Sequence, residues 1–599
     1  MTDQAVAALN AEEIEARYEQ ERVKRLRADG NAQYVAMTGQ YAHYMEDPFA
    51  HENPDISLDP VSIDTEVALI GAGFGNLQAA VELQKQGIED FILFDRASDF
   101  GGVWYWNRYP GVACDVDSYI YMPMLEETGY MPTRKYATGR EIFEYAKLMG
   151  RHFDLYKRAL FRREIADIRW NDEEARWHVT TNRGDVVRAR FVHLATGPLQ
   201  LPRLPGIPGI EGFKGHSFHT SRWDYGYTGG NADGGLEGLR DKRVGIIGTG
   251  ATAVQAIPFL GQYAKQLYVF QRTPAMVPVR NHMDTDPEWA NSLKPGWQQE
   301  RMDNFNILVS GGRQDVDLVD DGWTEVLHRV GIETDRMSDE AAAEKQRLAD
   351  LEYMEGLRNR VDALVEDKET AEKLKPWYHA NCKRPCFHDD YLQTFNRPNV
   401  MLVDTDGKGV ERVTENAVIV DGKEYEVDCL IYATGFEFNT ADMSARNGFE
   451  VYGRGGRSWS QKWKEDGIST YYGYTMRGFP NLVVEGNAQG TLSANITHAL
   501  GEGAKHLAYL VRQSKDRQWS SIEPSEEAER KYVDFVHKTT YRIKHDERCT
   551  PGYYNNEGKV DEGTGIAQFY PGSPHVFFQK MGEWRAKGDL EGMELIPAP

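Results

Sequence analysis

Long apolar runs are missing from this sequence of 599 residues. No segment approaches the roughly 20 consecutive apolar residues that a helix needs to span a bilayer. The N-terminus also lacks the basic and then apolar pattern of a signal peptide. We therefore expect a protein without a membrane partner that works in the cytoplasm.

An excess of positive charge is missing as well. The chain has 69 Lys and Arg against 92 Asp and Glu, which gives a formal net charge of -23. A nucleic-acid-binding protein needs clustered cations, because much of its affinity comes from displaced phosphate counterions. The charge balance therefore argues against nucleic acid as a partner, and against anionic membrane surfaces for the same reason.

Cysteine is scarce, and the chain contains Cys114, Cys382, Cys386, Cys429 and Cys549. A sparse set of odd number suits a reducing compartment better than a framework of disulfides. Cys382 and Cys386 form C-x3-C rather than the C-x2-C of a redox dithiol, so we expect a structural pair. No second Cys or His pair stands at ligand spacing, and we expect no metal site.

The residues that are present have ordinary globular proportions, 41% hydrophobic and 27% charged, and the length allows two or three domains. Near the N-terminus, Asn10 and Glu13 fit a helix cap, and Glu21 and Arg25 form an i,i+4 pair. We expect residues 1–63 to be a helical extension, an accessory layer packed outside the catalytic core.

Two parts of the chain have the order strand, glycine-rich turn, helix, strand. One runs from residue 65 to residue 95 around the turn G-A-G-F-G-N, and the other from residue 243 to residue 272 around the turn G-T-G-A-T-A. In such a βαβ unit the glycines make a tight turn and let the backbone approach a pyrophosphate at the N-terminus of the helix. The sequence therefore predicts two dinucleotide sites.

The residue that ends each second strand distinguishes the two sites. Asp95 lies 24 positions after Gly71, and Arg272 lies 24 positions after Gly248. A carboxylate at this place accepts hydrogen bonds from ribose hydroxyls, whereas an arginine pairs with a 2'-phosphate. We therefore expect FAD at the first site and NADPH rather than NADH at the second. Asn76 replaces the third glycine of the first turn and is expected to crowd the helix against the strand.

These patterns predict an α/β protein with two Rossmann-like dinucleotide-binding domains, for FAD and NADP, together with a helical insert and an N-terminal helical extension. A charged, helix-rich stretch without turn-punctuated strands predicts the insert. After the extension, the predicted boundaries are 64–195 for the first part of the FAD-binding domain, 196–273 for the first part of the NADP-binding domain, 274–379 for the helical insert, 380–434 for the second part of the NADP-binding domain, and 435–599 for the second part of the FAD-binding domain, with a mobile active-site loop.

A twelve-residue pattern lies between the two dinucleotide units. Residues 213–224, F-K-G-H-S-F-H-T-S-R-W-D, match F-x-G-x-x-x-H-T-x-x-W-[PD] at every specified position. This pattern is the fingerprint of type I Baeyer-Villiger monooxygenases, and the chain resembles that family from about residue 65 to residue 495. Two further segments are similar to the family, the glycine- and tryptophan-rich run at 101–115 and the pair Lys383-Arg384.

The resemblance implies that the protein inserts one oxygen atom of O2 beside the carbonyl of a ketone. It implies that NADPH reduces FAD and that a flavin C4a-peroxide then attacks the carbonyl, which gives an ester or lactone. By resemblance, Arg384 is the cation that stabilises the peroxide, and Asp115 is the carboxylate that holds Arg384 over the flavin. His219 and Trp223 resemble family residues that couple the two domains without taking part in the chemistry.

The cofactor residues follow from the two turns and from the family positions. For FAD they are Gly71, Gly73, Phe74, Gly75, Asp95, Gly102, Val103, Trp104, Asp115 and Tyr121. For NADP they are Gly248, Thr249, Gly250, Ala251, Thr252, Arg272, Thr273, Lys383 and Arg384. Among these, the resemblance assigns the 2'-phosphate to Lys383, Arg272 and Thr273.

The resemblance also implies a substrate pocket lined by apolar residues of the helical insert and by a mobile C-terminal loop, which we expect at residues 549–559. This loop and the long N-terminal extension resemble the branch of the family that acts on large or macrocyclic ketones. Two alternatives stay open. A flavin monooxygenase that oxygenates nitrogen or sulfur is one, and Arg384 argues against it. A non-catalytic FAD- and NADPH-binding sensor is the other, and Arg384, Asp115 and Lys383 together argue against it.

Overall fold

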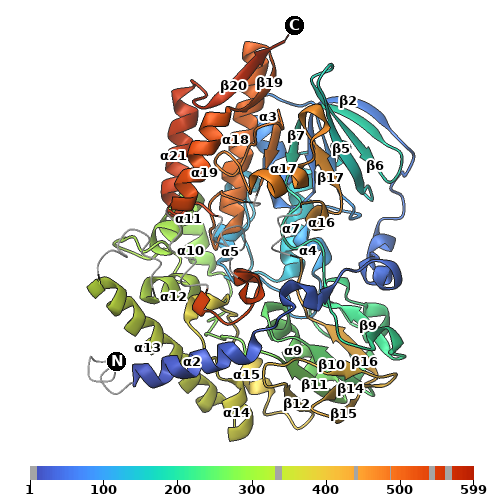
Figure 1. The fold of residues 1–599 in the computed structure, drawn as a ribbon, viewed down its shortest axis with the longest axis vertical. Helices are drawn as coiled ribbons and strands as arrows, with labels where there is room; N and C mark the ends of the chain where they lie inside the picture. Colours follow the sequence, from blue (N-terminus) through green and yellow to red (C-terminus); the bar gives the residue numbers. More distant parts are fainter. Residues whose placement is uncertain are drawn as a thin grey trace.

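The computed structural model describes residues 10–330, 340–437, 443–485, 488–538, 547–559 and 569–598. Two sheets built largely from parallel strands lie in the upper and lower halves of Figure 1, and helices pack around both. The predicted α/β class with two Rossmann-like domains is confirmed.

The larger sheet has the strand order β17-β5-β6-β7-β2-β3-β4, with β18 paired to β7. Its centre is the parallel pair β2 (Ser62–Ile70) and β3 (Phe91–Phe94), in which Ile70 lies opposite Phe94. β3 and the second half of β2 are apolar without alternation, as expected for strands covered on both faces. The other strands are β4 (Ala159–Leu160), β5 (Ile165–Asn171), β6 (Arg176–Thr181), β7 (Val186–Leu194), β17 (Glu450–Tyr452) and β18 (Leu482–Val484). The helix α3 (Phe74–Lys85) follows β2 and packs against α18 (Ile496–Arg517).

The second sheet is entirely parallel and has the order β12-β11-β10-β16-β9. Its strands are β9 (His216–His219), β10 (Arg243–Ile247), β11 (Gln266–Gln271), β12 (Val400–Asp404) and β16 (Cys429–Tyr432). Beside it lies a small antiparallel sheet of β13 (Arg412–Val413), β14 (Ala417–Val420) and β15 (Lys423–Glu426). The helix α9 (Ala251–Tyr263) follows β10, so the turn between them opens at the carboxyl edge of the sheet.

The stretch predicted as a helical insert is helical in the structure and lies at the left of Figure 1. Its helices are α10 (Pro287–Ser292), α11 (Trp297–Leu308), α12 (Gly322–Val330), α13 (Glu340–Leu364) and α14 (Lys368–Leu374). Among the parts of the chain that the structure describes, no helix has the length and apolar character needed to cross a membrane.

The N-terminal extension begins with α2 (Ala11–Arg25), which contacts α13 (Figure 1). The Asn10 side chain caps it by accepting from the Glu13 amide at 3.3 Å, and Arg25 pairs with Glu21 at 2.7 Å. The predicted capped helix is thereby confirmed. Further along, β1 (Tyr34–Val35) pairs with β8 (Leu204–Pro205), so the extension is joined to the core by strand pairing.

The C-terminal region carries a covalent link. Cys549 forms a disulfide with Cys382, 167 residues earlier in the sequence. Cys382 and Cys386 do not pair with each other, because Cys382 is bonded to the distant Cys549 and Cys386 is a buried free thiol. The loop that begins at Cys549 continues into the 3-10 helix η10 (Tyr553–Gly558). The same C-terminal region contains α19 (Glu526–Lys538), α21 (Pro574–Lys587) and the antiparallel pair β19 (Trp519–Pro524) and β20 (Met593–Pro597).

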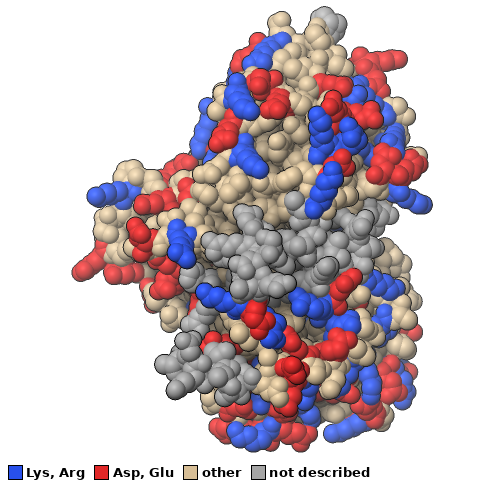
Figure 2. Space-filling model, turned by 60° about the vertical axis from the view of Figure 1, so that its left-hand side comes forward, with Lys and Arg blue, Asp and Glu red and all other residues tan. Residues whose placement is uncertain are grey.

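Charge is mixed over the surface. On the face that Figure 2 shows, Lys and Arg are interspersed with Asp and Glu over both halves of the molecule. This distribution gives no continuous basic stripe on that face of the described chain, which is the footprint that a nucleic acid would need.

Candidate active site

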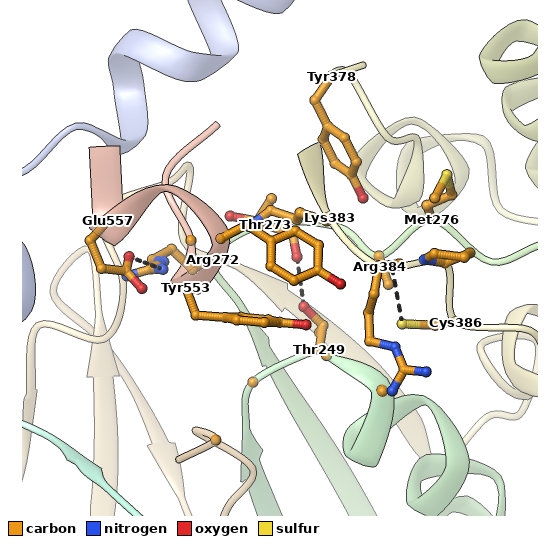
Figure 3. A pocket seen from close by; sticks show the side chains of 18 of the residues that line it. Thr249, Arg272, Thr273, Met276, Tyr378, Lys383, Arg384, Cys386, Tyr553 and Glu557 are labelled. Atoms are coloured by element: carbon orange, nitrogen blue, oxygen red, sulfur yellow. Dashed lines mark hydrogen bonds and ion pairs between the residues drawn. The ribbon is translucent and has the colours of Figure 1, made fainter. Parts of the chain in front are cut away.

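A cavity of about 1500 Å³ opens at the carboxyl ends of β10 and β11 (Figure 3). Ligands of parallel α/β sheets bind at this edge, because the strand-to-helix turns open there. All nine residues predicted for NADP line the cavity: Gly248, Thr249, Gly250, Ala251, Thr252, Arg272, Thr273, Lys383 and Arg384. None of the ten residues predicted for FAD is among the described residues that line it. The two predicted sets therefore occupy different places.

The residues predicted for FAD meet around the first glycine-rich turn. Gly71 has φ 100°, and a Cβ atom there would lie 2.6 Å from the carbonyl oxygen of Ala195. A Cβ atom on Gly102 would lie 2.7 Å from the Cα of Gly73, so these segments can touch only because both residues lack a side chain. The bare backbone at the N-terminus of α3 is the kind of cradle that a pyrophosphate needs.

Side chains of the FAD set are also brought together at this turn. Asp95 accepts hydrogen bonds from the backbone amides of Ala72 and Ala97 at 2.6 and 2.8 Å. The indole of Trp104 donates to the hydroxyl of Tyr121 at 3.1 Å. The structure thus places the predicted acid beside the turn, and it joins the segment after Gly102 to the helix that carries Tyr121.

Asn76 does not crowd the helix in the way that the sequence suggested. Its side chain is fully buried and donates to the carbonyl oxygen of Gly71 at 2.7 Å. Its amide oxygen lies 2.6 Å from Nδ1 of His193, which is itself fully buried. The larger side chain is accommodated because hydrogen bonds tie it to the turn and to β7, and that expectation is corrected.

The second glycine-rich turn faces the cavity. Gly248 has φ 113°, and a Cβ atom on it would lie 2.4 Å from the carbonyl oxygen of Ala433. Gly250 is exposed, and a Cβ atom there would meet no described atom within 4 Å. None of the described side chains caps α9, so its first backbone amides point at open space. This arrangement fits a bound pyrophosphate.

The predicted catalytic residues are in direct contact. Arg384 donates from Nη2 to Oδ2 of Asp115 at 2.5 Å. Burial lowers the pKa of the Arg384 guanidinium, but the neighbouring charge of Asp115 raises it, and the resulting pKa lies above the ordinary value. Arg384 therefore carries a permanent positive charge at the cavity wall, with its Cζ 5.9 Å from the centre of the Trp323 ring.

The residues predicted for the 2'-phosphate also lie together (Figure 3). Arg272 forms an ion pair with Glu557 at 3.2 Å, and Thr273 Oγ1 accepts from Arg25 at 3.1 Å. Burial lowers the pKa of the Lys383 ammonium to about 8. Two cations and a hydroxyl on one wall can hold a phosphate by charge-assisted hydrogen bonds.

The N-terminal extension reaches this wall, which the sequence did not predict. Gln33 accepts from Arg272 at 2.5 Å, and Arg25 donates to the backbone carbonyl of Arg272 at 3.0 Å. Gln33 and Tyr34 both line the cavity. The prediction of an accessory layer outside the catalytic core is therefore wrong. The polar segment after α2 has no period or motif that could have shown this contact.

Two residues of the twelve-residue pattern, His219 and Trp223, are buried inside the protein. Trp223 is fully buried and donates from its indole to Thr228 at 3.0 Å. His219 is fully buried, and its ring meets Phe436 edge-on at 5.7 Å, just after the chain returns from the second sheet. Burial lowers the pKa of the His219 imidazole to about 3, so it stays neutral. These surroundings fit residues that join the two domains.

The helical region and the C-terminal loop supply apolar walls of the same cavity. Val309, Trp323 and Leu327 come from the helical region, and Tyr553 and Tyr554 come from η10. The expectation that both segments face one pocket matches their positions. Among the described residues, no group of three or more His, Cys, Asp and Glu is placed to hold a metal ion.

Comparison with known proteins gives one family. The family described as flavin-binding monooxygenase-like matches residues 64–289. Neopentalenolactone D synthase of Streptomyces avermitilis is 48% identical over 98% of this chain and 99% of its own length. A Baeyer-Villiger monooxygenase of Stachybotrys chlorohalonatus is 49% identical over 97% of this chain and 94% of its own.

Comparison with solved structures points to the same family. The polycyclic ketone monooxygenase from Thermothelomyces thermophila superposes with a TM-score of 0.91 at 38% identity, covering 98% of this chain and 99% of its own. The closed structure of a cyclohexanone monooxygenase has a TM-score of 0.73 at 28% identity, covering 90% of this chain and 100% of its own. This chain therefore belongs to the type I Baeyer-Villiger monooxygenases, which use FAD, NADPH and O2 to convert ketones into esters or lactones.

Proposed function

We propose that this enzyme acts on bulky, ring-containing ketones and that Arg384 and Asp115 form its catalytic charge pair. The observation that carries the proposal is the 2.5 Å hydrogen bond between these residues, with Arg384 on the wall of a large cavity. A permanent cation at the reacting oxygen favours attack by an anionic nucleophile on a carbonyl. It disfavours the alternative, oxygenation of nitrogen or sulfur, which needs an electrophilic oxygen.

We assign FAD to the cradle around Gly71, Gly73 and Gly102, and NADPH to the turn around Gly248 and Gly250. Close backbone approach at both turns and the uncovered start of α9 support this assignment. When bound, the two cofactors supply the reducing equivalents and the activated oxygen. The domain boundaries predicted above follow from this division, and we propose them unchanged.

Within the site, Arg384 has an electrostatic task. Its guanidinium stabilises negative charge on the reacting oxygen and on the carbonyl oxygen of the ketone as the new bond forms. Asp115 holds the guanidinium in one direction, so no reorganisation is needed at that moment. Trp323 and Tyr553 supply apolar walls that limit the access of water.

The opposite wall recognises the nucleotide. In our proposal Arg272, Thr273 and Lys383 bind the 2'-phosphate, which NADH lacks. Arg272 stands where Asp95 stands in the other unit, so opposite charges at the same position select between the two nucleotides.

A large substrate is supported by space and by similarity. The cavity of about 1500 Å³ exceeds the roughly 300–1,000 Å³ of ordinary ligand pockets, so it can take a nucleotide and a bulky ketone together. The solved structure that superposes with a TM-score of 0.91 is that of a polycyclic ketone monooxygenase. We also propose the cytoplasm as the location, because NADPH is regenerated there.

Product analysis tests the proposal. Purified enzyme receives NADPH and air with fused-ring ketones, with cyclohexanone and with a dialkyl sulfide, and mass spectrometry follows the gain of one oxygen. We expect lactones, with turnover highest for the fused-ring ketones. Sulfoxide without lactone would contradict the proposal, and FAD-loaded protein that oxidises no NADPH with any ketone would revive the sensor alternative.

A further inference from the structure

Glu557 is a buried carboxylate among cations in the cavity wall. Its side chain is 2% exposed, and its Oε2 pairs with Arg272 at 3.2 Å. Its Oε1 accepts from the Tyr34 hydroxyl at 3.1 Å and lies 3.5 Å from the guanidinium of Arg203. Burial raises the pKa of this carboxyl, but the charges of Arg272, Lys383 and Arg203 outweigh burial and hold the pKa below its ordinary value. Glu557 is therefore an anion at neutral pH.

Two nitrogens of the Arg272 guanidinium already have protein partners, although the side chain is 27% exposed. Nη1 donates to Gln33 at 2.5 Å. Nη2 donates to Glu557 at 3.2 Å (Figure 3). A guanidinium binds carboxylates and phosphates through the same N–H groups. A phosphate that binds Arg272 through its remaining N–H groups comes close to the carboxylate that already pairs with Nη2. The nitrogen that pairs with another anion is the one for which the phosphate competes.

We propose that Glu557 is a resident competitor for the 2'-phosphate, and that binding of NADPH transfers Arg272 from Glu557 to that phosphate. The inference rests on the proposed function, in which Arg272 recognises the 2'-phosphate. A carboxylate and a phosphate dianion cannot share one partly buried guanidinium without strong repulsion. NADH leaves the ion pair intact, so Glu557 tunes how strongly the enzyme separates the two nucleotides.

When Arg272 moves from Glu557 to the phosphate, the loop that carries Glu557 stays attached to the rest of the protein. Glu557 keeps contacts to Tyr34 and Arg203 through Oε1, so only the Oε2 contact is exchanged. Upstream, the Cys382–Cys549 disulfide holds the start of the loop, and Lys383 donates to the carbonyl of residue 551 at 2.9 Å. The loop is therefore tethered at its start, and in our proposal the part around Glu557 adjusts when the Oε2 contact is exchanged.

This shift reaches the ketone side of the cavity. Tyr553 and Tyr554 belong to the same 3-10 helix as Glu557, and both line the cavity. Tyr553 is also close enough to Arg384 for the two to interact electrostatically. Nucleotide binding at Arg272 is thereby coupled to the wall that meets the ketone.

Calorimetry on the FAD-loaded enzyme tests the proposal without turnover. The probes are 2',5'-ADP, NADP+ and NAD+, titrated into the parent and into Glu557→Gln. The matched control is Glu547→Gln, which removes the same charge from an exposed position near the start of the loop. We expect Glu557→Gln to bind 2',5'-ADP and NADP+ about tenfold more tightly, the size of one charge-assisted hydrogen bond, with NAD+ unchanged. The control should match the parent.

The possible outcomes distinguish a failure of the inference about Glu557 from a failure of the assignment of Arg272 to the 2'-phosphate. Equal or weaker binding of 2',5'-ADP by Glu557→Gln overturns the inference, because it makes Glu557 a support that positions Arg272. Arg272→Ala tests the assignment itself, and an unchanged preference for NADP+ over NAD+ in that variant would refute it. A melting temperature near that of the parent shows that Glu557→Gln folds. Should it unfold, Glu557→Asp, which shortens the side chain and weakens the pair, must give a smaller tightening of the same sign.

Discussion

Arg384 donates a hydrogen bond of 2.5 Å to Asp115, although the two residues lie 269 positions apart in the sequence. Arg384 follows the helical region, and Asp115 belongs to the segment that touches the first glycine-rich turn. A cation held in this way stabilises developing charge without first reorienting. Replacing Arg384 therefore removes the positive charge, whereas replacing Asp115 leaves the charge and removes the contact that orients it.

Arg384→Ala should still take up FAD and still be reduced by NADPH, yet form almost no ester. The physical reason is that its charge is used only when negative charge develops on oxygen, and loss of such a donor costs about 10²- to 10³-fold in rate. Stopped-flow absorbance follows flavin reduction, and gas chromatography follows the ester. Ester formation near the parent rate would show that the assigned role is wrong.

Asp115→Ala should lower the rate of ester formation by about 10- to 100-fold, because the guanidinium keeps its charge and loses its direction. Binding of NADP+ to the variant, measured by calorimetry, should stay close to the parent value. Asp115→Asn, which can still accept one hydrogen bond, is the conservative control and should recover part of the rate. Full activity in Asp115→Ala would mean that packing alone positions Arg384.

Local pattern predicted the two dinucleotide units well. The second unit was predicted from residue 243 to residue 272, and in the structure β10 (Arg243–Ile247) begins at that first residue and β11 (Gln266–Gln271) ends just before the last, because apolar runs beside a glycine turn leave little choice. The nine NADP residues meet at one cavity for the same reason. A strand, a turn and a helix carry their geometry with them wherever the chain places them.

Contacts between distant segments were not predictable in this way. Gln33 and Glu557 both meet Arg272, 239 and 285 positions away, and no spacing rule connects such residues. The partner of Cys382 was missed because the pairing of cysteines cannot be read from their spacing. Asn76 was misjudged because its hydrogen-bond partner His193 lies on another strand.

Affinity for NADP+ should fall as the pH rises above about 8. In the folded protein, burial lowers the pKa of Lys383 to about 8, so its ammonium is present below that pH and lost above it. The 2'-phosphate, with a second pKa of about 6, stays dianionic throughout this window. Its attraction to Lys383 therefore weakens with rising pH, by at most about tenfold per pH unit.

Calorimetric dissociation constants at pH 7, 8 and 9 check this prediction, with NAD+ as the reference that lacks the phosphate. Lys383→Arg is the matched control, since a guanidinium stays charged through the window and should remove the pH dependence. A parent enzyme whose ratio of NADP+ to NAD+ affinity is constant from pH 7 to pH 9 would rule out Lys383 as a ligand of the 2'-phosphate.

The last prediction concerns the disulfide between Cys382 and Cys549. It closes 167 residues, and in the chain-entropy model a loop of this length destabilises the unfolded state by about 5 kcal/mol, an upper estimate. Cys549→Ser should therefore lower the melting temperature of the FAD-loaded enzyme, as scanning calorimetry can measure. Dithiothreitol should lower that of the parent toward the variant's value and leave the variant unchanged. Because Lys383 follows Cys382 directly, the variant should also bind 2',5'-ADP more weakly. Equal melting temperatures with and without reductant in the parent would mean that the bond adds nothing to its stability.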